Sequence, residues 1–299
     1  MKFRSGFVTI IGDTNVGKST LINRIVGEKI AIVSPKPQTS RQNTIGVYND
    51  DNCQIVFIDT PGYHKTKHKL DEFMQDSIDE AVEDVNVIIF VIDAKKSLKE
   101  QYEKLYKQQG EAKAKKILCI NKIDESTFEK MYPQLDELNK ICKLDEILPI
   151  SAKKGKNVDV LIDMIKKYLP VYDYEMRYYP VEEFTDKNVR FLSAEIIREK
   201  ILLHYEDEIP HGVAVQIISF EETEESCKIY ADIYCERDSH KSILIGKNGE
   251  KIKELSIKSR QEIEKMVDKK VYLELFVKVK PNWRVDSQIL AEWGYKLDN

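Results

Sequence analysis

The first half of the chain alternates short apolar runs with longer polar segments. The apolar runs are rich in β-branched residues, as expected for strands buried on both faces of a mostly parallel sheet. They lie at Phe7–Ile11, Gln54–Ile58, Val87–Ile92, Ile117–Ile120 and Ile147–Ile150. Segments of helical length lie between or after them, for example Leu98–Gln109, Met131–Ile141 and Val158–Tyr168. Strands that alternate with helices predict an α/β doubly wound fold.

The pattern changes after residue 170. Residues 171–186 are rich in Tyr, Asp, Glu and Pro without clear periodicity, which predicts a linker. Beyond it the periodicity predicts two helices and three strands. The helices are Ser193–His204 and Glu250–Val267, and the strands are Val213–Ile218, Ile229–Cys235 and Val271–Val279. We therefore expect an α/β domain over residues 1–170 and a smaller α+β domain over residues 187–299.

Composition favours a folded protein without a membrane span. Hydrophobic residues make up 42% of the 299 residues and charged residues 33%, which suits packed cores. The longest strongly apolar run, Val85–Ile92, is far shorter than the roughly 20 residues of a spanning helix. No long apolar stretch typical of a secretory signal follows the first residues. Five scattered cysteines without a C-x-x-C pair are typical of a reducing compartment, so we expect a soluble, cytoplasmic protein.

Charge is unevenly distributed along the chain. Residues 1–170 carry 27 Lys and Arg against 25 Asp and Glu, whereas residues 171–299 carry 20 against 26. Within the acidic half, residues 237–260 hold seven basic residues against three acidic ones. A basic cluster inside an acidic domain is typical of a local nucleic-acid contact, although many basic helix faces are simply solvated.

A phosphate-binding loop follows the first predicted strand. Gly12-Asp-Thr-Asn-Val-Gly17-Lys18-Ser19 stands between that strand and a helix, which is the context a P-loop requires. The glycines let backbone N–H groups curl around phosphate oxygens at a helix N-terminus. We expect Lys18 to reach the β- and γ-phosphates and the Ser19 hydroxyl to bind Mg²⁺.

Three later motifs complete a guanine-nucleotide site. Asp59-Thr60-Pro61-Gly62 offers a carboxylate that can hold Mg²⁺ through water and an N–H that can reach a γ-phosphate. In Asn121-Lys122-Ile-Asp124 the Asp carboxylate can accept two hydrogen bonds from guanine, which adenine does not offer. Asn121 can bridge the base edge to the phosphate loop, and the Lys122 stem can cover the ring. Ser151-Ala152 suits a backbone N–H to guanine O6.

In order and spacing these motifs resemble those of translation-factor-type GTPases. The resemblance places switch I at Gln38–Gln42, where either Thr39 or Ser40 would bind Mg²⁺ in the GTP state. It implies GTP, GDP and Mg²⁺ as ligands, with Ser19, Thr39 or Ser40, and Asp59 through water, at the metal. The residues expected to line the nucleotide site are Gly12, Asn15, Val16, Gly17, Lys18, Ser19, Thr20, Thr39, Ser40, Asp59, Thr60, Pro61, Gly62, Asn121, Lys122, Asp124, Ser151 and Ala152.

The sequence does not identify a catalytic residue. Ras-like enzymes place a Gln after D-x-x-G to orient the attacking water, but here Tyr63 and His64 follow. His64 as general base is a weak hypothesis, because phosphoryl transfer depends mostly on positioning and electrostatics. Asn15 matches the asparagine that in related GTPases helps to hold K⁺ near the phosphates. We therefore expect slow hydrolysis that K⁺ stimulates.

The second half holds an RNA-binding signature. Gly246-Lys247-Asn248-Gly249 follows Ile245 and precedes the helix Glu250–Val267. A G-x-x-G loop with a basic residue, between a strand region and a helix, resembles the KH-domain loop that clamps about four nucleotides. We expect bases to pack on Ile243, Ile245 and Ile252. The expected RNA-binding residues are Ile245, Gly246, Lys247, Asn248, Gly249, Lys251 and Lys253.

A P-loop GTPase domain joined by a short linker to a KH domain resembles the Era family of bacterial ribosome-assembly GTPases. Further resemblance lies in Lys36–Thr39, Ser193–Lys200 and Leu273–Lys280, so it spans nearly the whole chain. It implies a type II-like KH domain that binds the 3′ end of 16S rRNA and helps 30S subunit assembly and rRNA maturation. It also implies peripheral association with the inner membrane surface. The chain departs from the family at Asp13-Thr14, where Arg-Pro is usual.

Two other functions stay open. The KH domain could act as a binding module for which the nucleotide is only a structural cofactor. The absence of a glutamine after Gly62 is compatible with this alternative. The chain could instead be a GTPase that acts on a protein or membrane partner, against which the intact Gly246–Gly249 loop counts. No heptad pattern suggests a coiled coil, and we expect a monomer.

Overall fold

The computed structural model describes residues 2–295 except residues 37–38, 64–67, 111 and 142. The chain divides into two compact units. The first comprises Met1–Ala31, Ser40–His64 and Met74–Asp186, and the second comprises Ile32–Thr39, Lys65–Phe73 and Lys187–Asn299. Among the described residues, none of the helices combines the length and apolar character needed to span a bilayer.

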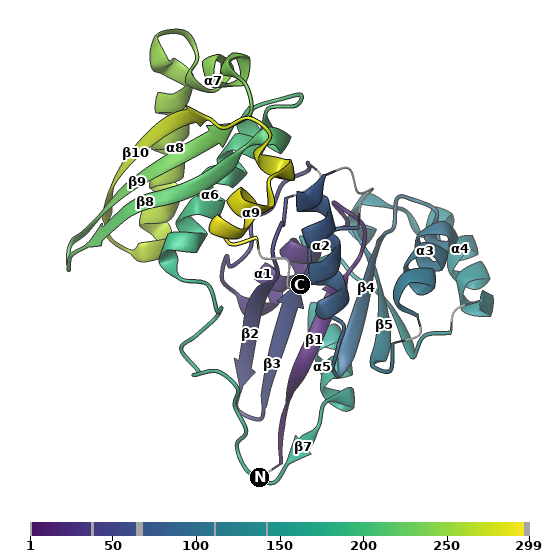
Figure 1. Cartoon of the computed structure of the whole chain (residues 1–299). Coiled ribbons are helices and arrows are strands. Elements are labelled where there is room, and N and C mark those ends of the chain that lie inside the picture. The colour runs from purple at the N-terminus through teal and green to yellow at the C-terminus, as the bar shows by residue number, and fades with distance from the viewer. Residues whose placement is uncertain (1, 37–38, 64–67, 111, 142, 296–299) are drawn as a thin grey trace. The chain divides into compact units, whose positions relative to one another are not determined.

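A largely parallel sheet forms the centre of the first unit (Figure 1). Its strand order is β2-β3-β1-β4-β5-β6, in which only the edge strand β2 runs antiparallel to its neighbour, and the short β7 pairs antiparallel with β1. The strands are β1 Phe3–Ile11, β2 Thr44–Asp50, β3 Cys53–Asp59, β4 Val87–Asp93, β5 Lys115–Asn121, β6 Glu146–Pro149 and β7 Val171–Tyr172. This confirms the predicted α/β fold with a mostly parallel sheet.

Helices cover both faces of this sheet, as Figure 1 shows. They are α1 Lys18–Val26, α2 Lys69–Glu80, α3 Leu98–Gln109, α4 Phe128–Ile141 and α5 Val158–Tyr168. Side chains of β4 alternate between two apolar clusters: Ile89 joins the one built with α1 and α5, and Phe90 the one built with α2, α3 and α4. A strand buried on both faces needs a continuous apolar run, which is the pattern the sequence carries here.

The sequence analysis did not predict β2. This edge strand holds few apolar side chains and contains a glycine, so its apolar signal is weak. Gly46 is required by packing, because a Cβ there would lie 2.5 Å from the Ile30 side chain. The fold therefore uses a residue of low strand propensity to let α1 and the segment after it approach the sheet.

Residues 171–186, predicted as a linker, lie along the edge of the first unit. The Gln54 side-chain oxygen accepts hydrogen bonds from the backbone of Tyr178 at 2.6 Å and Tyr179 at 3.0 Å. The Val47 N–H donates to the Phe184 carbonyl at 2.9 Å. This segment lacks periodicity because it is an extended chain that forms hydrogen bonds with the sheet instead of a helix or strand of its own.

The second unit contains a three-stranded sheet of order β10-β9-β8, with β10 parallel and β8 antiparallel to β9. Its elements are α6 Val189–His204, β8 Ala214–Glu222, β9 Ser226–Cys235, α7 Asp238–Ile245, α8 Glu250–Val267, β10 Lys270–Val279 and α9 Ser287–Glu292. Helices α6 and α8 pack on one face of the sheet through Ile197, Leu255 and Ile263 (Figure 1). On β10, Tyr272 and Phe276 are 54% and 45% exposed, whereas Val271, Leu273 and Val277 are buried.

One element before the KH loop was wrongly predicted. The sequence suggested a strand region ahead of Gly246, but the short helix α7 stands there. Its signal is poor because only Leu244 is buried, so no apolar stripe of helical period is visible. The Gly246–Gly249 loop therefore connects two helices.

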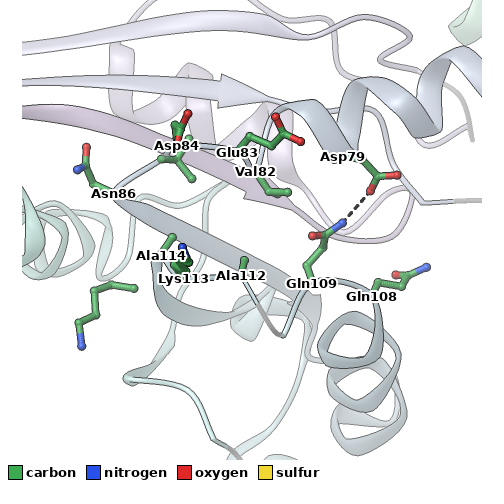
Figure 2. A pocket seen from close by; sticks show the side chains of 12 residues that line it. Asp79, Val82, Glu83, Asp84, Asn86, Gln108, Gln109, Ala112, Lys113 and Ala114 are labelled. Carbon is green, nitrogen blue, oxygen red and sulfur yellow. Dashed lines mark hydrogen bonds between the residues drawn. The ribbon is translucent and has the colours of Figure 1, made fainter.

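A polar pocket of about 890 Å³ lies beside the amino ends of β4 and β5. Figure 2 shows its lining, in which the Gln109 amide donates a 2.8 Å hydrogen bond to Asp79. The nucleotide motifs lie at the carboxyl ends of strands β1, β3, β5 and β6 of the same sheet. The pocket is therefore at the opposite edge of the sheet from those motifs.

Candidate functional site

The phosphate loop joins β1 to α1, as the sequence predicts. Asn15 (φ 63°) and Gly17 (φ 100°) both adopt left-handed backbone conformations, and Gly17 is the N-cap residue of α1. Successive N–H groups in such turns form a concave anion-binding nest at the helix N-terminus. A Cβ at Gly17 would also lie 2.4 Å from the Asn121 side-chain nitrogen, so glycine is needed for two reasons. Val16 is buried in the core, and Thr20 is half-buried in α1.

Lys18 already lies over the loop. Its Nζ donates to the carbonyl oxygens of Gly12 at 3.0 Å and Asp13 at 3.1 Å. Burial lowers the pKa of Lys18 to about 8, although the charges of Asp59 and Asp13 counteract this shift. A buried ammonium group held by two carbonyls is favourably placed to exchange these contacts for phosphate oxygens.

A cluster of oxygen atoms fits a magnesium ion. The Ser19 hydroxyl donates to Asp59 Oδ2 at 2.8 Å and lies 3.0 Å from the Ser40 hydroxyl. Asp59 Oδ1 is buried and has no hydrogen-bond partner among the described residues. Burial raises the pKa of Asp59 to about 6, against the effects of Lys18 and Ser19. A buried carboxylate oxygen beside two hydroxyls is the donor set that Mg²⁺ prefers.

The two candidate switch I ligands differ in position. Ser40 is in the first unit, beside Ser19. Thr39 is in the second unit, and its hydroxyl donates to the Lys36 carbonyl at 2.6 Å. The Ser40 hydroxyl thus belongs to the oxygen cluster, whereas the Thr39 hydroxyl is bonded to the backbone of its own segment.

The motif Asp59–Gly62 is fixed against the phosphate loop. The Thr60 hydroxyl is buried and donates to the Ile10 carbonyl at 2.8 Å, so it anchors the motif to β1. Pro61 is buried. A Cβ at Gly62 would lie 2.8 Å from Thr14 Cα, which explains the requirement for glycine at this close approach.

Tyr63, which follows Gly62 where Ras-like enzymes place a glutamine, is buried. Its side chain is 3% exposed and belongs to the apolar cluster formed with α2, α3 and α4. Its N–H donates to the Gly12 carbonyl at 3.2 Å. Tyr63 thus anchors the start of the segment after Gly62, which we call switch II, while His64 lies outside the described residues.

The base motif connects three segments of chain. Asn121 donates to the Val16 carbonyl at 2.8 Å and accepts from the Ala152 N–H at 2.9 Å. The N–H that the sequence suggested for guanine O6 is therefore used by Asn121. Asp124 is exposed and accepts a 2.6 Å hydrogen bond from the Ser151 hydroxyl. This bond is the main cause that lowers the pKa of Asp124.

Asp93 is a residue that sequence reasoning missed. Lys122 Nζ contacts the Asp93 carboxylate at 2.7 Å and also donates to the Asn15 carbonyl. Asp93 is 3% exposed and pairs in register with Asn121 across β4 and β5. The sequence showed only that a carboxylate ends the strand next to the one that carries the base motif. Asp93 orients Lys122, which links the base motif to the phosphate loop.

The Gly246–Gly249 loop has the backbone of a tight phosphate-accessible turn. Gly246 (φ 75°, ψ 175°), Asn248 (φ 51°) and Gly249 (φ 77°) all have positive φ, and residues 247–249 form one 3₁₀ turn. Lys247 and Asn248 are exposed. On α8, Lys251 and Lys253 are exposed, and Lys251 Nζ lies 5.8 Å from the Tyr205 ring centroid.

The predicted apolar contacts for bases flank this loop. Ile243 is 44% exposed, whereas Ile245 and Ile252 are half-buried against the core of the unit. Apolar side chains beside exposed lysines and a glycine-rich turn can contact bases and phosphates together.

Two family models match the chain. Residues 7–122 match the family described as 50S ribosome-binding GTPase, and residues 208–284 match the KH domain. The first match covers the phosphate loop and ends within the base motif, at Lys122, and the second covers the Gly246–Gly249 loop.

Curated relatives match over nearly their full length. The GTPase Era of Clostridium acetobutylicum is 47% identical over 294 residues, which is 98% of each chain. The GTPase Era of Clostridium botulinum strain Hall is 45% identical over 98% of this chain and 99% of the relative.

Solved structures agree with these matches. One is Era in complex with MgGDPNP and nucleotides 1506–1542 of 16S ribosomal RNA, and another is a tyrosine-to-alanine variant of Aquifex aeolicus Era bound to GDP.AlF4−. Each has a TM-score of 0.92 and 38% identity, over 99% of this chain and 100% of the other. With its P-loop GTPase domain and its KH domain, the chain belongs to the Era family of GTPases.

Proposed function

We propose that this GTPase binds the 3′ end of 16S rRNA through its KH domain and assists assembly of the 30S subunit and maturation of its rRNA. The observation that carries the proposal is the Gly246–Gly249 turn, whose backbone is open to phosphates and whose Lys247 is exposed. The Era structure that contains nucleotides 1506–1542 of 16S rRNA supports the choice of RNA.

The nucleotide controls this binding in the proposed mechanism. Ser19, Ser40 and, through water, Asp59 would hold Mg²⁺, which offsets the charge of the phosphates. Asn15 would provide a ligand to K⁺ beside the same phosphates. Binding of GTP orders Ser40 and the segment after Gly62, and release of phosphate frees them. The surface they form changes the affinity of the KH loop for RNA.

The proposed cell compartment is the cytoplasm, where the 30S subunit is assembled. The proposed form is a monomer, divided into GTPase and RNA-binding parts around residues 171–186. Peripheral contact with the inner membrane surface is a further property that the family resemblance implies.

Fluorescence anisotropy of a labelled oligonucleotide that matches the 3′ tail of 16S rRNA tests the proposal. The titration is run with a non-hydrolysable GTP analogue and with GDP, at fixed near-physiological salt because phosphate contacts depend on salt. Tighter binding in the GTP state, lost with a scrambled oligonucleotide, is the expected result. Equal affinity in both states would remove the switch, and no binding in either would favour a protein or membrane partner.

Loop variants identify the binding surface. Lys247→Asp together with Asn248→Asp should abolish RNA binding, because two carboxylates would face the RNA backbone. Lys228→Asp is a suitable control, since Lys228 is exposed on β9 in the same unit. Multiple turnovers of GTP, with faster hydrolysis in K⁺ than in Na⁺, would exclude a purely structural nucleotide.

A further inference from the structure

A carboxylate and an ammonium group meet at the phosphate loop, away from the oxygen cluster of the metal site. Asp13 lies in the loop, and its Oδ1 accepts a hydrogen bond from Lys104 Nζ of α3. The Asp13 side chain is 25% exposed and that of Lys104 47% exposed. None of the roles described above uses the side chain of either residue.

Asp13 is close to the phosphate-binding lysine. Its carbonyl accepts a hydrogen bond from Lys18 Nζ at 3.1 Å, and its carboxylate charge acts on the same ammonium group. An ionised carboxylate here competes with phosphate for Lys18 and repels the phosphate charge. Because GTP carries more negative charge than GDP, this repulsion is larger for GTP.

Asp13 also adjoins the start of switch II. Its backbone forms a parallel bridge with Tyr63, whose N–H donates to the neighbouring Gly12 carbonyl. The Tyr63 ring lies in an apolar cluster with Leu98 and Leu105 of α3. Helix α3 therefore supports this corner twice, through Lys104 at Asp13 and through apolar packing at Tyr63.

We propose that Lys104 is a positioning residue of the nucleotide site: by neutralising and holding Asp13, it sets the affinity of the phosphate loop for GTP relative to GDP. The proposal concerns the nucleotide site and is independent of which RNA the KH domain binds. Lys104 neutralises the negative charge of Asp13, a residue of the phosphate loop itself. Without Lys104, the Asp13 carboxylate would be left uncompensated beside Lys18.

A double-mutant cycle tests the proposal with fluorescent GDP and a fluorescent non-hydrolysable GTP analogue. Lys104→Gln should weaken binding of the GTP analogue relative to GDP by about two- to fivefold, the range set by a partly exposed ion pair. Asp13→Asn should leave the ratio near that of the wild type. The combined Asp13→Asn/Lys104→Gln variant should restore it, because no uncompensated carboxylate remains.

The order of these variants separates positioning from simple stabilisation. If the pair only stabilises the fold, both single variants lower the melting temperature and the ratio of GTP to GDP affinity stays that of the wild type. Lys107→Gln removes the same charge from an exposed position of α3 and should leave the ratio unchanged. An unchanged ratio in Lys104→Gln, or a double variant no better than it, overturns the proposal. Failure of the wild type to bind GDP would be a separate result, against the nucleotide site itself.

Discussion

The Asn121 side chain donates a 2.8 Å hydrogen bond to the Val16 carbonyl, across a sequence separation of 105 residues. Its oxygen accepts the Ala152 N–H at 2.9 Å. One amide thus ties the end of β5 both to the phosphate loop and to the segment after β6. Phosphate recognition and base recognition are therefore held in one fixed geometry, independently of the nucleotide's own contacts.

Replacing this amide should damage both recognition sites together. Asn121→Ala leaves the Val16 carbonyl and the Ala152 N–H without their partner, at a cost of about 1–3 kcal/mol for each buried group. We expect a lower free energy of unfolding in urea and a loss of affinity, by about tenfold or more, for GDP and for the GTP analogue alike. Lys140→Ala, which removes an ion pair with Asp136 on the exposed face of α4, is the control. Retention of full affinity by Asn121→Ala would contradict the shared geometry.

The positions of Thr39 and Ser40 predict different effects on magnesium. Ser40→Ala removes a hydroxyl from the oxygen cluster, and we expect the Mg²⁺ concentration for half-maximal binding of the GTP analogue to rise by about tenfold, equivalent to about 1.4 kcal/mol. Thr39→Val removes a hydroxyl bonded to the Lys36 carbonyl and should change this concentration much less. Ser40→Thr keeps a hydroxyl and serves as the rescue variant. The opposite ranking of the two substitutions would assign the metal to Thr39.

Asp59 predicts a pH dependence of the metal-free, nucleotide-free protein. Burial raises its pKa from 3.8 to about 6 in the folded chain, so the protonated form is favoured there. The stabilisation from protonated Asp59 is present below the unfolded pKa and is lost as pH rises through about 6. The loss amounts to about 3 kcal/mol at neutral pH.

Asp59→Asn replaces the carboxyl group by a neutral group of similar shape. The variant should match the wild type in free energy of unfolding near pH 4 and exceed it near pH 7. Urea denaturation at both pH values measures the difference. A difference independent of pH would show that Asp59 is not the group that titrates.

Two substitutions of Tyr63 distinguish a structural role of its ring from a catalytic role of its hydroxyl. Burial raises the pKa of its hydroxyl, and the Gln109 side chain counteracts this shift. Tyr63→Phe removes only this hydroxyl and should change the free energy of unfolding by no more than about 1.5 kcal/mol, with an unchanged rate of GTP hydrolysis. Tyr63→Ala should lower the free energy of unfolding by about 3–5 kcal/mol, because it empties a site in the core. A marked fall in the hydrolysis rate of Tyr63→Phe would instead give the hydroxyl a role in the reaction.

Local sequence signals predicted the elements that carry strong periodicity. Helix α8 has the predicted bounds Glu250–Val267, and α3 and α5 also match, because each has a clear apolar stripe. Strand β2 was missed, since it holds few apolar side chains and Gly46 is there for packing against Ile30. Helix α7 was also missed, because it is short and only Leu244 is buried, so its sequence shows no clear apolar face.

The nucleotide site could be predicted to the level of its motifs but not to that of its partners. Motif spacing places Asn121 and Lys122 near the phosphate loop. It does not reveal that Asp93 holds Lys122, or that Lys104 reaches Asp13, because these pairs depend on how β4 and α3 pack. The choice between Thr39 and Ser40 also needs the backbone path, since adjacent residues point in different directions.

The two glycines of the KH loop are expected to respond differently to substitution. At Gly246 a Cβ would lie 2.7 Å from the Lys251 side chain, and the backbone (φ 75°, ψ 175°) is in a region almost restricted to glycine. At Gly249 (φ 77°, ψ 12°) a Cβ would meet nothing within 4 Å, and this left-handed conformation costs an alanine about 1–2 kcal/mol.

Gly246→Ala should therefore lower the melting temperature more than Gly249→Ala, and more than Gly249→Asn, since Asn tolerates the left-handed region. Gly27→Ala, at another left-handed position with open space around it, is the control in the GTPase part of the chain. Thermal unfolding followed by circular dichroism measures the ranking. If Gly249→Ala were the more destabilised variant, backbone strain at Gly246 would not be what fixes the loop, and the turn would have to be held by the packing of α7 against α8.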